Sequence, residues 1–459
     1  MATLAGVWSA PPGGAATRAA TPTGPFTIST VPPLVPAFAS NIPNYVVHCA
    51  GAPTTQIVTS QTAKVGGTKF KGPVTLSEPL IAGQDVQVTG GGQTYSIRCL
   101  PADFPVYSTV VSGQPQAPGY LVGVDNYAIA FDNNGVPVWW YPDKDSLTSP
   151  WDAKFLNSST IAWNDWGGSY ELHSLSGQLV GTVGGGSVPL DFHELTRVRN
   201  GVYLGIMDVT RNCPAIPAQC VNLSSWGLSA QSRIIDNVIV EFNASNKILW
   251  SWSAADHLNL ATENANWRDQ FPDVIHMNSV ISDGNGGVIF SARHLDAVYR
   301  VDMKTGAVTW KIGGTSDPNS LAVGGDQYAN VFSGQHFAQL LPDGTLTVQD
   351  NGSRENRQPR AIRFALDPTA KTATIVEQVS DPRAAPAFCC GSAVKLPTGD
   401  WVADWGAGPY VTELSPQGVP QITISFAVGF SYRADILGAS VRSLRNGMDA
   451  MVPPLVVTG

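Results

Sequence analysis

A repeated unit of short β-strands constrains the fold of this chain more than any other sequence feature. Each unit carries an apolar run, a turn that usually contains Asp or Asn, a glycine, and a second run with Trp or Ile. Examples are AIAFDNNGVPVWWYP, VEFNASNKILWSW, YRVDMKTGAVTWKIGG and TELSPQGVPQITISF. The units recur at irregular spacings of roughly 40 to 80 residues, which indicates repeats with loop insertions. Four-stranded units of this size, repeated around an axis, are typical of a β-propeller.

The number of units predicts an all-β chain in which residues 119–459 form a six-bladed β-propeller. The first unit, residues 119–148, contains three strands and lacks the inner one. The C-terminal stretch ILGASVRSLRNG contains Ala439, seven residues ahead of an Asn-Gly turn. We expect this stretch to supply the missing inner strand and to close the ring, because closure removes the open sheet edges that invite aggregation.

A smaller β domain is predicted ahead of the propeller. Residues 1–26 are rich in Ala, Pro, Gly and Thr, which predicts a disordered lead-in. Residues 27–105 contain short alternating runs separated by Gly and Pro, which predicts a small β-sandwich-like domain. Residues 106–118 are interpreted as a linker.

The six cysteines bear on both fold and location; they are Cys49, Cys99, Cys213, Cys220, Cys389 and Cys390. The first pair brackets the small β domain and the second pair closes a short loop, and both spacings suit disulfides. The state of the adjacent third pair stays open. The even count favours an extracytoplasmic protein, either secreted or periplasmic. The N-terminal residues contain no intact signal peptide, so a cytoplasmic location stays the alternative.

Charge and hydropathy exclude two classes of function. Charged residues make up only 14% of the chain, its net charge is −8, and its basic residues form no cluster. These properties argue against a nucleic-acid-binding surface. No apolar run approaches the ~18 residues of a membrane-spanning helix, so no membrane span is predicted.

Three of the seven histidines occupy the same step of the repeated unit. His193, His276 and His336 are each followed seven residues later by an Asn-Gly or Asp-Gly turn and a β-rich run. We interpret this step as the start of the inner strand, which in chain order begins at Asp152, His193, His276, His336 and Gly391. Because inner strands of a propeller start at one mouth of the channel, the three imidazoles should converge there.

Arg293 belongs to the same predicted blade as His276 and can reach the same pocket. A glycosidase needs two carboxylates at a defined separation, which this position does not supply. Imidazoles with a guanidinium instead favour a tetrahedral oxyanion such as sulfate or phosphate, because Arg offers a planar fork of donors and His can act as nucleophile, acid or base. A structural salt bridge between blades is the other interpretation of Arg293.

Four segments resemble the bacterial arylsulfotransferase family; they are DFHEL (191–195), IHMNS (275–279), SARHLDAVYRVDMKTGAVTWKIGG (291–314) and SGQHFAQLLPDGTLTVQDNG (333–352). The resemblance covers roughly residues 117–440. It implies a six-bladed propeller that moves a sulfuryl group from an aryl sulfate to a phenol without the nucleotide donor PAPS or another cofactor. It also implies a ping-pong mechanism in which His336 is transiently sulfurylated, while His193, His276 and Arg293 hold the sulfuryl oxygens.

The substrate contacts predicted beside these four residues are Asn278, Trp166, Trp405 and Phe337. The aromatic rings lie near inner-strand positions and can face an aryl group, although Trp residues also commonly pack between blades. Asn278 is either a partner of His276 or substrate, or a strand-end cap. His294 is interpreted as structural, because strand alternation points it away from the side of Arg293. The expected partners are a small aryl sulfate and a phenol of unspecified identity, and the oligomeric state stays open.

Two other functions compete with sulfuryl transfer. The first is a metal-dependent lyase or oxidase in which His193, His276 and His336 ligate one metal ion, since three imidazoles and an open position form a plausible metal site. The second is a non-catalytic extracellular binding propeller. The prediction retained is sulfuryl transfer without a bound metal.

Overall fold

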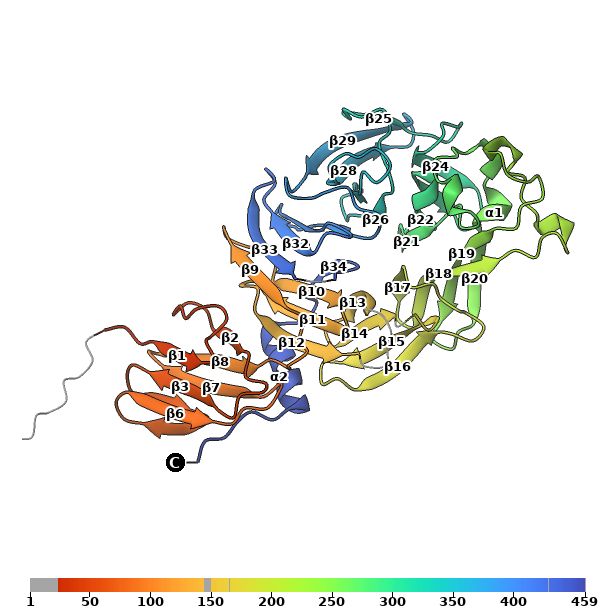
Figure 1. The fold of residues 1–459 in the computed structure, drawn as a ribbon. Helices are drawn as coiled ribbons and strands as arrows, with labels where there is room; N and C mark the ends of the chain where they lie inside the picture. Colours follow the sequence, from red (N-terminus) through yellow and green to blue (C-terminus); the bar gives the residue numbers. More distant parts are fainter. Residues whose placement is uncertain (1–23, 144–149, 165, 428, 459) are drawn as a thin grey trace, which may run out of the picture.

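The structure is a computed structural model that describes residues 24–143, 150–164, 166–427 and 429–458 (Figure 1). Residues 1–23 of the predicted disordered lead-in therefore lie outside the described residues. The regular secondary structure of the described residues is almost entirely β-strand, as the repeats predict. Neither α-helix in this part of the chain has the length and apolar character that a membrane crossing requires.

The N-terminal part of the chain forms two sheets. The smaller sheet has the order β1 (Ile28–Val31), β3 (Thr55–Thr59) and β6 (Val74–Glu78). The larger sheet has the order β2 (Asn44–Val47), β8 (Gln93–Cys99), β7 (Asp85–Gly90), β4 (Ala63–Val65) and β5 (Thr68–Phe70). The predicted Cys49–Cys99 disulfide is present, and both of its residues lie in the core of this part.

Six sheets of four or five strands follow, which we number I to VI. Sheet I contains β12 (Pro137–Pro142), β11 (Tyr127–Asp132), β10 (Gly119–Val124) and β34 (Ala434–Ile436). Sheet II contains β13 (Trp151–Asn157), β14 (Thr160–Asn164), β15 (Ser169–Ser174) and β16 (Leu179–Gly184). Sheet III contains β17 (Leu195–Arg199), β18 (Val202–Thr210), β19 (Ile235–Asn243) and β20 (Ile248–Ser253).

In sheets IV to VI, as in sheets II and III, the first strand named is the inner one. Sheet IV contains β21 (Met277–Ser282), β22 (Gly287–Ala292), β23 (Ala297–Asp302) and β24 (Val308–Gly313). Sheet V contains β26 (His336–Leu340), β27 (Leu346–Asp350), β28 (Arg360–Asp367), β29 (Thr372–Val379) and β25 (Ala322–Gly324). Sheet VI contains β30 (Ser392–Lys395), β31 (Trp401–Asp404), β32 (Tyr410–Leu414), β33 (Pro420–Phe426) and β9 (Tyr107–Val111). In Figure 1 the six sheets succeed one another around a common centre.

The recurring turns of the repeat have a common hydrogen-bonded geometry. Asp132 accepts from the backbone N–H groups two and four residues later, at 2.9 and 3.0 Å. Asn243 and Asp283 repeat the same two bonds in sheets III and IV. A short polar side chain therefore closes each hairpin by binding its own backbone, and the following glycine or polar residue completes the turn.

Two expectations about the strands at the chain ends are wrong. The predicted linker, residues 106–118, contains β9, which pairs antiparallel with β33 and forms the outer edge of sheet VI. The inner strand of sheet I is β34, which pairs with β10, and not the stretch that contains Ala439. Strands β9 and β34 therefore each complete a sheet whose other strands lie far away in the sequence.

The stretch around Ala439 leads into a helix, α2 (Val441–Met451), which packs on β12. Ser440 caps it by accepting from the N–H of Ser443 at 3.1 Å, and Leu444 and Met448 bury one face at a spacing of four. A Cβ at Gly447 would lie 2.2 Å from the carbonyl oxygen of Leu175, so glycine allows the helix to approach the β15–β16 turn. The Asn-Gly step thus serves helix packing and not a hairpin.

The last residues return to the N-terminal sheets, which corrects the predicted propeller boundary of 119–459. The N–H of Val457 donates to the carbonyl oxygen of Gly66 at 2.9 Å, and that of Leu455 donates to Asp85 at 2.8 Å. Val457 is buried in the core of the N-terminal part. Figure 1 shows the C-terminus beside these sheets.

Candidate active site

The three histidines of the shared register lie together at the starts of the inner strands. His336 is the first residue of β26, and His276 directly precedes β21. The ring centroids of His193 and His276 are 4.7 Å apart, and those of His193 and His336 are 6.2 Å apart. Exposure falls from the side chain of His276, at 25%, through His193, at 8%, to His336, which is 1% exposed. The cluster therefore runs from the rim of the mouth to its floor.

The Nδ1 atoms of two histidines are paired with carboxylates. His193 Nδ1 forms a short contact with Asp191, whose carboxylate also accepts from the N–H of His193 at 2.8 Å. His276 Nδ1 lies 2.5 Å from Oδ2 of Asp273. A carboxylate at Nδ1 fixes the orientation of the ring and leaves Nε2 to face the mouth.

His336 has a different partner. Its Nδ1 lies 2.7 Å from the backbone carbonyl oxygen of Gly391, which can only accept, so Nδ1 carries the proton. Burial lowers the pKa of His336 well below its usual value, and the charges of Arg433 and His193 lower it further. His336 is therefore a neutral imidazole whose Nε2 carries an electron pair and can accept a hydrogen bond.

Arg293 and His294 both lie beside the cluster, which corrects the expectation that strand alternation points His294 away from the side of Arg293. The chain forms a 3-10 turn over Arg293–Leu295, so strand alternation does not apply. His294 stacks on His276 at 4.4 Å between centroids, and its Nε2 lies 3.1 Å from Nη1 of Arg293. The guanidinium Nη2 also donates to Ser353 at 3.3 Å and to the carbonyl oxygen of Phe388.

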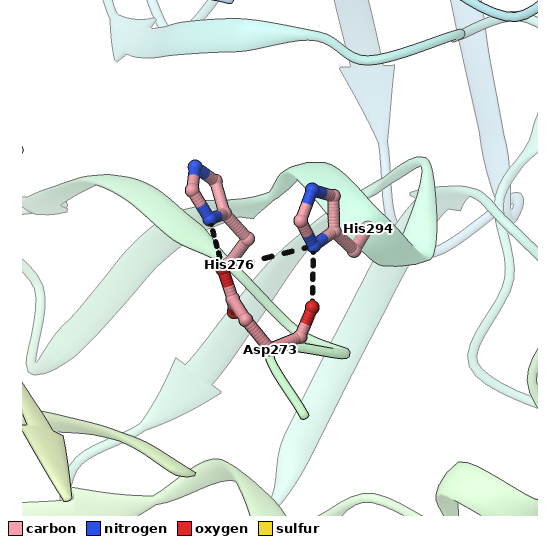
Figure 2. Close-up of side chains that lie close together, drawn as sticks. All are labelled: Asp273, His276 and His294. Carbon is pink, nitrogen blue, oxygen red and sulfur yellow. Dashed lines mark hydrogen bonds and ion pairs between the residues drawn. The ribbon is translucent and has the colours of Figure 1, made fainter. Parts of the chain in front are cut away.

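Asp273, His276 and His294 form the single group of three candidate metal ligands in the described part of the chain (Figure 2). Their ligand atoms lie within 4.8 Å of one another, and the group includes neither His193 nor His336. His294 has no free nitrogen, because Nδ1 donates to the carbonyl oxygen of Asp273 at 2.7 Å and Nε2 accepts from Arg293. The adjacent guanidinium also repels a cation. The arrangement therefore does not favour the three-histidine metal site.

Tyr432 and Arg433 are the site residues that the sequence analysis missed. The hydroxyl of Tyr432 lies 3.2 Å from Nε2 of His336 and 3.3 Å from the carbonyl oxygen of His193. Arg433 directly precedes β34, just as His276 precedes β21. Alignment of SYRAD with the histidine register, in place of Ala439, is the signal that would have found both residues.

Arg433 belongs to a buried cluster of four charges. Its Nη1 lies 2.6 Å from Asp152 and 3.0 Å from Glu194. Lys154 completes the cluster, with Nζ 2.7 Å from Asp152 and in contact with Glu194. The carbon Cζ of Arg433 lies 5.0 Å from the ring centroid of Tyr432. This four-charge cluster (Asp152, Lys154, Glu194 and Arg433) is electrically balanced and lies beneath the histidines.

The four predicted substrate contacts divide into two groups. Trp166 is 56% exposed and stacks on Phe192 at 4.3 Å, and Phe192 in turn stacks on His193 at 4.1 Å. Trp405 is fully buried in the core of sheet VI, and its indole N–H faces Thr412 at 3.4 Å. The prediction that Trp405 contacts the substrate is therefore wrong, because this indole has no exposed surface.

Asn278 and Phe337 also face away from the histidine cluster. The side chain of Asn278 is fully buried and donates to the carbonyl oxygen of Gln335 at 2.8 Å, so it links two inner strands instead of facing the mouth. Phe337 lies 4.7 Å from Cζ of Arg433 and lines a cavity of about 300 Å³ that none of the three histidines lines. Neither side chain lies among the three histidines, and the assignment of both residues as substrate contacts stays a prediction.

A comparison with known families decides the type of protein. Residues 213–427 match the family model described as Arylsulfotransferase (ASST). This chain is an enzyme of the arylsulfotransferase type. The match contains His276, Arg293 and His336, whereas His193 precedes it. The resemblance drawn from the four motifs is confirmed.

Solved structures share only remote similarity with this arylsulfotransferase. A protein of unknown function from Bacteroides caccae is 11% identical, with a TM-score of 0.42, over 70% of this chain and 98% of the other. The WD40 β-propeller domain of Doa1 is 10% identical, with a TM-score of 0.37, over 84% and 92%. The β-propeller domain of Cps50 (Swd1) from Myceliophteria thermophila is 10% identical, with a TM-score of 0.36, over 72% and 89%. No curated protein matches the chain.

The stability of this arylsulfotransferase should fall in mild acid through His294. Burial, with the charge of His276 as a second cause, lowers the pKa of His294 from 6.5 to about 2. Below pH 6.5 the unfolded chain binds a proton that the folded chain does not, so the free energy of unfolding falls by about 1.4 kcal/mol per pH unit for this group. We expect wild type to lose about this much more than His294→Asn between pH 6 and 5 in urea denaturation. Equal losses in both proteins would contradict the assignment of His294 as neutral.

Proposed function

We propose that this arylsulfotransferase moves a sulfuryl group from an aryl sulfate to a phenol through a sulfohistidine at His336. The observation that carries the proposal is the difference between the histidines. His193 and His276 are paired with carboxylates, whereas Nδ1 of His336 donates to a neutral carbonyl. A neutral imidazole whose Nε2 carries an electron pair is a nucleophile.

Fixed donors around His336 support the transfer of an anionic group. The Nε2 atoms of His193 and His276 are the nitrogens left to face the sulfuryl oxygens, because their Nδ1 atoms are held by carboxylates. Arg293 adds a positive charge, and its Nε is buried without a hydrogen-bond partner among the described residues. Donors that are already oriented toward developing negative charge lower the barrier without reorganisation. These roles of His193, His276 and Arg293 match those that the family resemblance implies.

The reaction proceeds in two half-reactions. In the first, Nε2 of His336 attacks sulfur, the bond from sulfur to the aryl oxygen breaks, and the phenolate takes a proton from Nε2 of a neighbouring histidine. In the second, that nitrogen removes the proton of the acceptor phenol. The phenol oxygen then attacks sulfur, and the N–S bond breaks. The proton is back on the neighbouring histidine, and the sulfuryl group ends on the acceptor.

Aromatic side chains beside His193 supply a surface for the aryl rings. Trp166 and Phe192 stack on each other, and Trp151 packs against Phe192 at 4.8 Å and against Tyr432 at 5.1 Å. Their exposed faces lie on the rim, beside the proposed nucleophile. A flat aryl group gains from stacking there in either half-reaction.

We also propose how the sheets are arranged and where the protein is located. Sheets I to VI would be the blades of one six-bladed propeller, and the two N-terminal sheets a separate β-sandwich-like domain. The disulfides Cys49–Cys99, Cys213–Cys220 and Cys389–Cys390 support an extracytoplasmic location, where disulfides persist.

Incubation with 4-nitrophenyl sulfate tests the mechanism. Without acceptor, we expect a burst of one nitrophenol per chain and a sulfuryl mass gain on the peptide that carries His336. Added phenol should then be sulfated as the mass gain disappears, with full activity in EDTA. Release of nitrophenol without sulfated phenol would indicate a hydrolase, and loss of activity in EDTA would revive the metal-dependent alternative.

A further inference from the structure

The segment 387–391, between β29 and β30, contains a disulfide between the adjacent residues Cys389 and Cys390. Cys390 has a φ of +70° and Gly391 has a φ of +92°. We call this segment the vicinal-disulfide turn. It contributes no side chain to the proposed chemistry, yet it borders the floor of the candidate active site.

The carbonyl oxygens of this turn hold two residues of the proposed mechanism. The oxygen of Gly391 accepts from Nδ1 of His336 at 2.7 Å, and the oxygen of Phe388 accepts from Nη2 of Arg293. The first bond fixes the tautomer and ring orientation of the nucleophile. The second holds the guanidinium on the same side of the mouth. The two acceptors flank the disulfide, one residue before it and one residue after it.

Two further carbonyl groups tie the turn to the strand end beyond β27. The oxygen of Cys390 accepts from Nδ2 of Asn351 at 2.9 Å, and this amide also donates to Gly334, two residues before His336, at 3.0 Å. The oxygen of Ala387 accepts from the hydroxyl of Ser353 at 2.5 Å. Four carbonyl groups within five residues therefore serve as acceptors for the site.

The close approach of neighbouring backbone at Gly391 leaves no room for a side chain. A Cβ there would lie 2.7 Å from the carbonyl oxygen of Asp404 and 2.9 Å from the backbone nitrogen of Gly406. The N–H of Gly391 donates to the carbonyl oxygen of Tyr432 at 2.9 Å. A rotation of the peptide before Gly391 would therefore disturb the hydrogen bonds to both Asn351 and Tyr432.

The disulfide holds Cys390 in a backbone conformation that a cysteine without this bond rarely adopts. L-residues other than Asn, Asp and Gly rarely adopt the left-handed conformation of Cys390. The ring formed by adjacent bonded cysteines restricts the torsions of both residues and keeps Cys390 in this conformation. Once the ring is open, Cys390 is free to leave the left-handed region, and the flanking carbonyl groups of Phe388 and Gly391 turn with it.

We propose that the Cys389–Cys390 disulfide is a redox-sensitive positioning element that holds His336 and Arg293 in place for sulfuryl transfer. The proposal rests on the proposed function of these two residues. The reductant is a dithiol. One of its thiolates attacks Sγ of one cysteine, which breaks the Cys389–Cys390 bond, releases the other cysteine and forms a mixed disulfide. The second thiol of the reductant then attacks this mixed disulfide and releases the first cysteine. The products are two cysteine thiols and the cyclic disulfide of the reductant, with two electrons and two protons transferred.

The turn is accessible to such a reductant. Phe388, next to the disulfide, is 69% exposed, and Cys389 is half-buried. Cys49 and Cys99 are at most 1% exposed, so their disulfide resists the same reagent. The remaining disulfide, Cys213–Cys220, lies in a surface loop and is removed by substitution.

The test uses the full chain with Cys213→Ser and Cys220→Ser, which leaves the proposed site intact. This protein is titrated with dithiothreitol, and alkylation followed by mass spectrometry reports the reduction of Cys389–Cys390. We expect kcat for 4-nitrophenyl sulfate to fall on the order of 10-fold in step with reduction, because small displacements of reacting groups are costly. KM should change less than about twofold, since the aromatic rim is untouched. Reoxidation should restore kcat.

Two variants give a matched control. In a Cys389→Ala background, Cys390→Gly should retain more activity than Cys390→Ala, because glycine adopts positive φ without a side-chain penalty. Both variants should be insensitive to dithiothreitol. Equal kcat in the oxidised and reduced protein would overturn the proposal. So would a fall of kcat on addition of dithiothreitol to either variant.

Amide hydrogen exchange separates this proposal from the proposed function. Reduction should speed exchange in the peptides that carry Gly391 and residues 335–340, whether or not the protein transfers a sulfuryl group. If the oxidised protein forms no sulfohistidine but the exchange still responds, the proposed function fails and the positioning role stands. Unchanged exchange after complete reduction would overturn the positioning role itself.

Discussion

Replacement of His336 with Asn lowers kcat for aryl sulfate turnover by at least about 10³-fold and abolishes the mass gain on its peptide. The Asn side chain keeps an N–H donor near the carbonyl oxygen of Gly391, so the backbone around it is preserved while the nucleophile is lost. Neither His193 nor His276 replaces it, because each is paired with a carboxylate at Nδ1. Stopped-flow release of nitrophenol measures the loss.

The control for this experiment is His257→Ala. His257 lies on α1 (Ala254–His257), where it stacks on Trp252 at 4.9 Å, and we expect kcat to stay within about twofold of wild type. If His336→Asn kept more than a tenth of the wild-type kcat, or if the sulfuryl group were found on another residue, the assignment of the nucleophile would fall.

The largest expected effect on stability comes from Arg433→Met, which should lower the free energy of unfolding by about 3–5 kcal/mol. Arg433 is 3% exposed and neutralises Asp152 and Glu194, which are equally buried. Its removal leaves two carboxylates to share the charge of Lys154, and a buried charge without its partner is strongly destabilising. Urea denaturation, followed by tryptophan fluorescence, measures the effect.

The double variant Asp152→Asn with Arg433→Met is the matched control. It removes one charge of each sign and leaves Lys154 paired with Glu194, so part of the lost stability should return. A loss below about 1 kcal/mol in Arg433→Met would show that the four-charge cluster does not hold the inner strands together. A double variant less stable than the single one would mean that Asp152 is needed for another reason.

The inner strands and their histidines could be predicted because the repeat carries a local signal. Each strand start is followed by an Asn-Gly or Asp-Gly turn at a fixed distance, and hairpin turns are set by short-range chemistry. The register therefore places His193, His276 and His336 correctly without knowledge of their contacts. The cysteine spacings likewise indicate Cys49–Cys99 and Cys213–Cys220, which the structure contains.

The errors arise where tertiary packing overrides local pattern. Residues Arg293–Leu295 leave the strand for a 3-10 turn, so alternation fails for His294. Ser440 and the apolar spacing of Leu444 and Met448 form a helix where an Asn-Gly step suggests a hairpin. The carboxylate partners, Asp191 and Asp273, become visible only in three dimensions, because which oxygen meets which imidazole depends on loop conformation.

The pairing of β9 with β33 and of β10 with β34 gives this chain a fixed order of assembly. Sheets II to V consist of consecutive segments and can form as the ribosome delivers them. Sheets I and VI cannot, because each combines strands that lie far apart in the chain. The N-terminal core depends on a still later segment, since Val457 follows β34. Such distant pairings slow folding, so sheets I and VI and the N-terminal core are completed after sheets II to V.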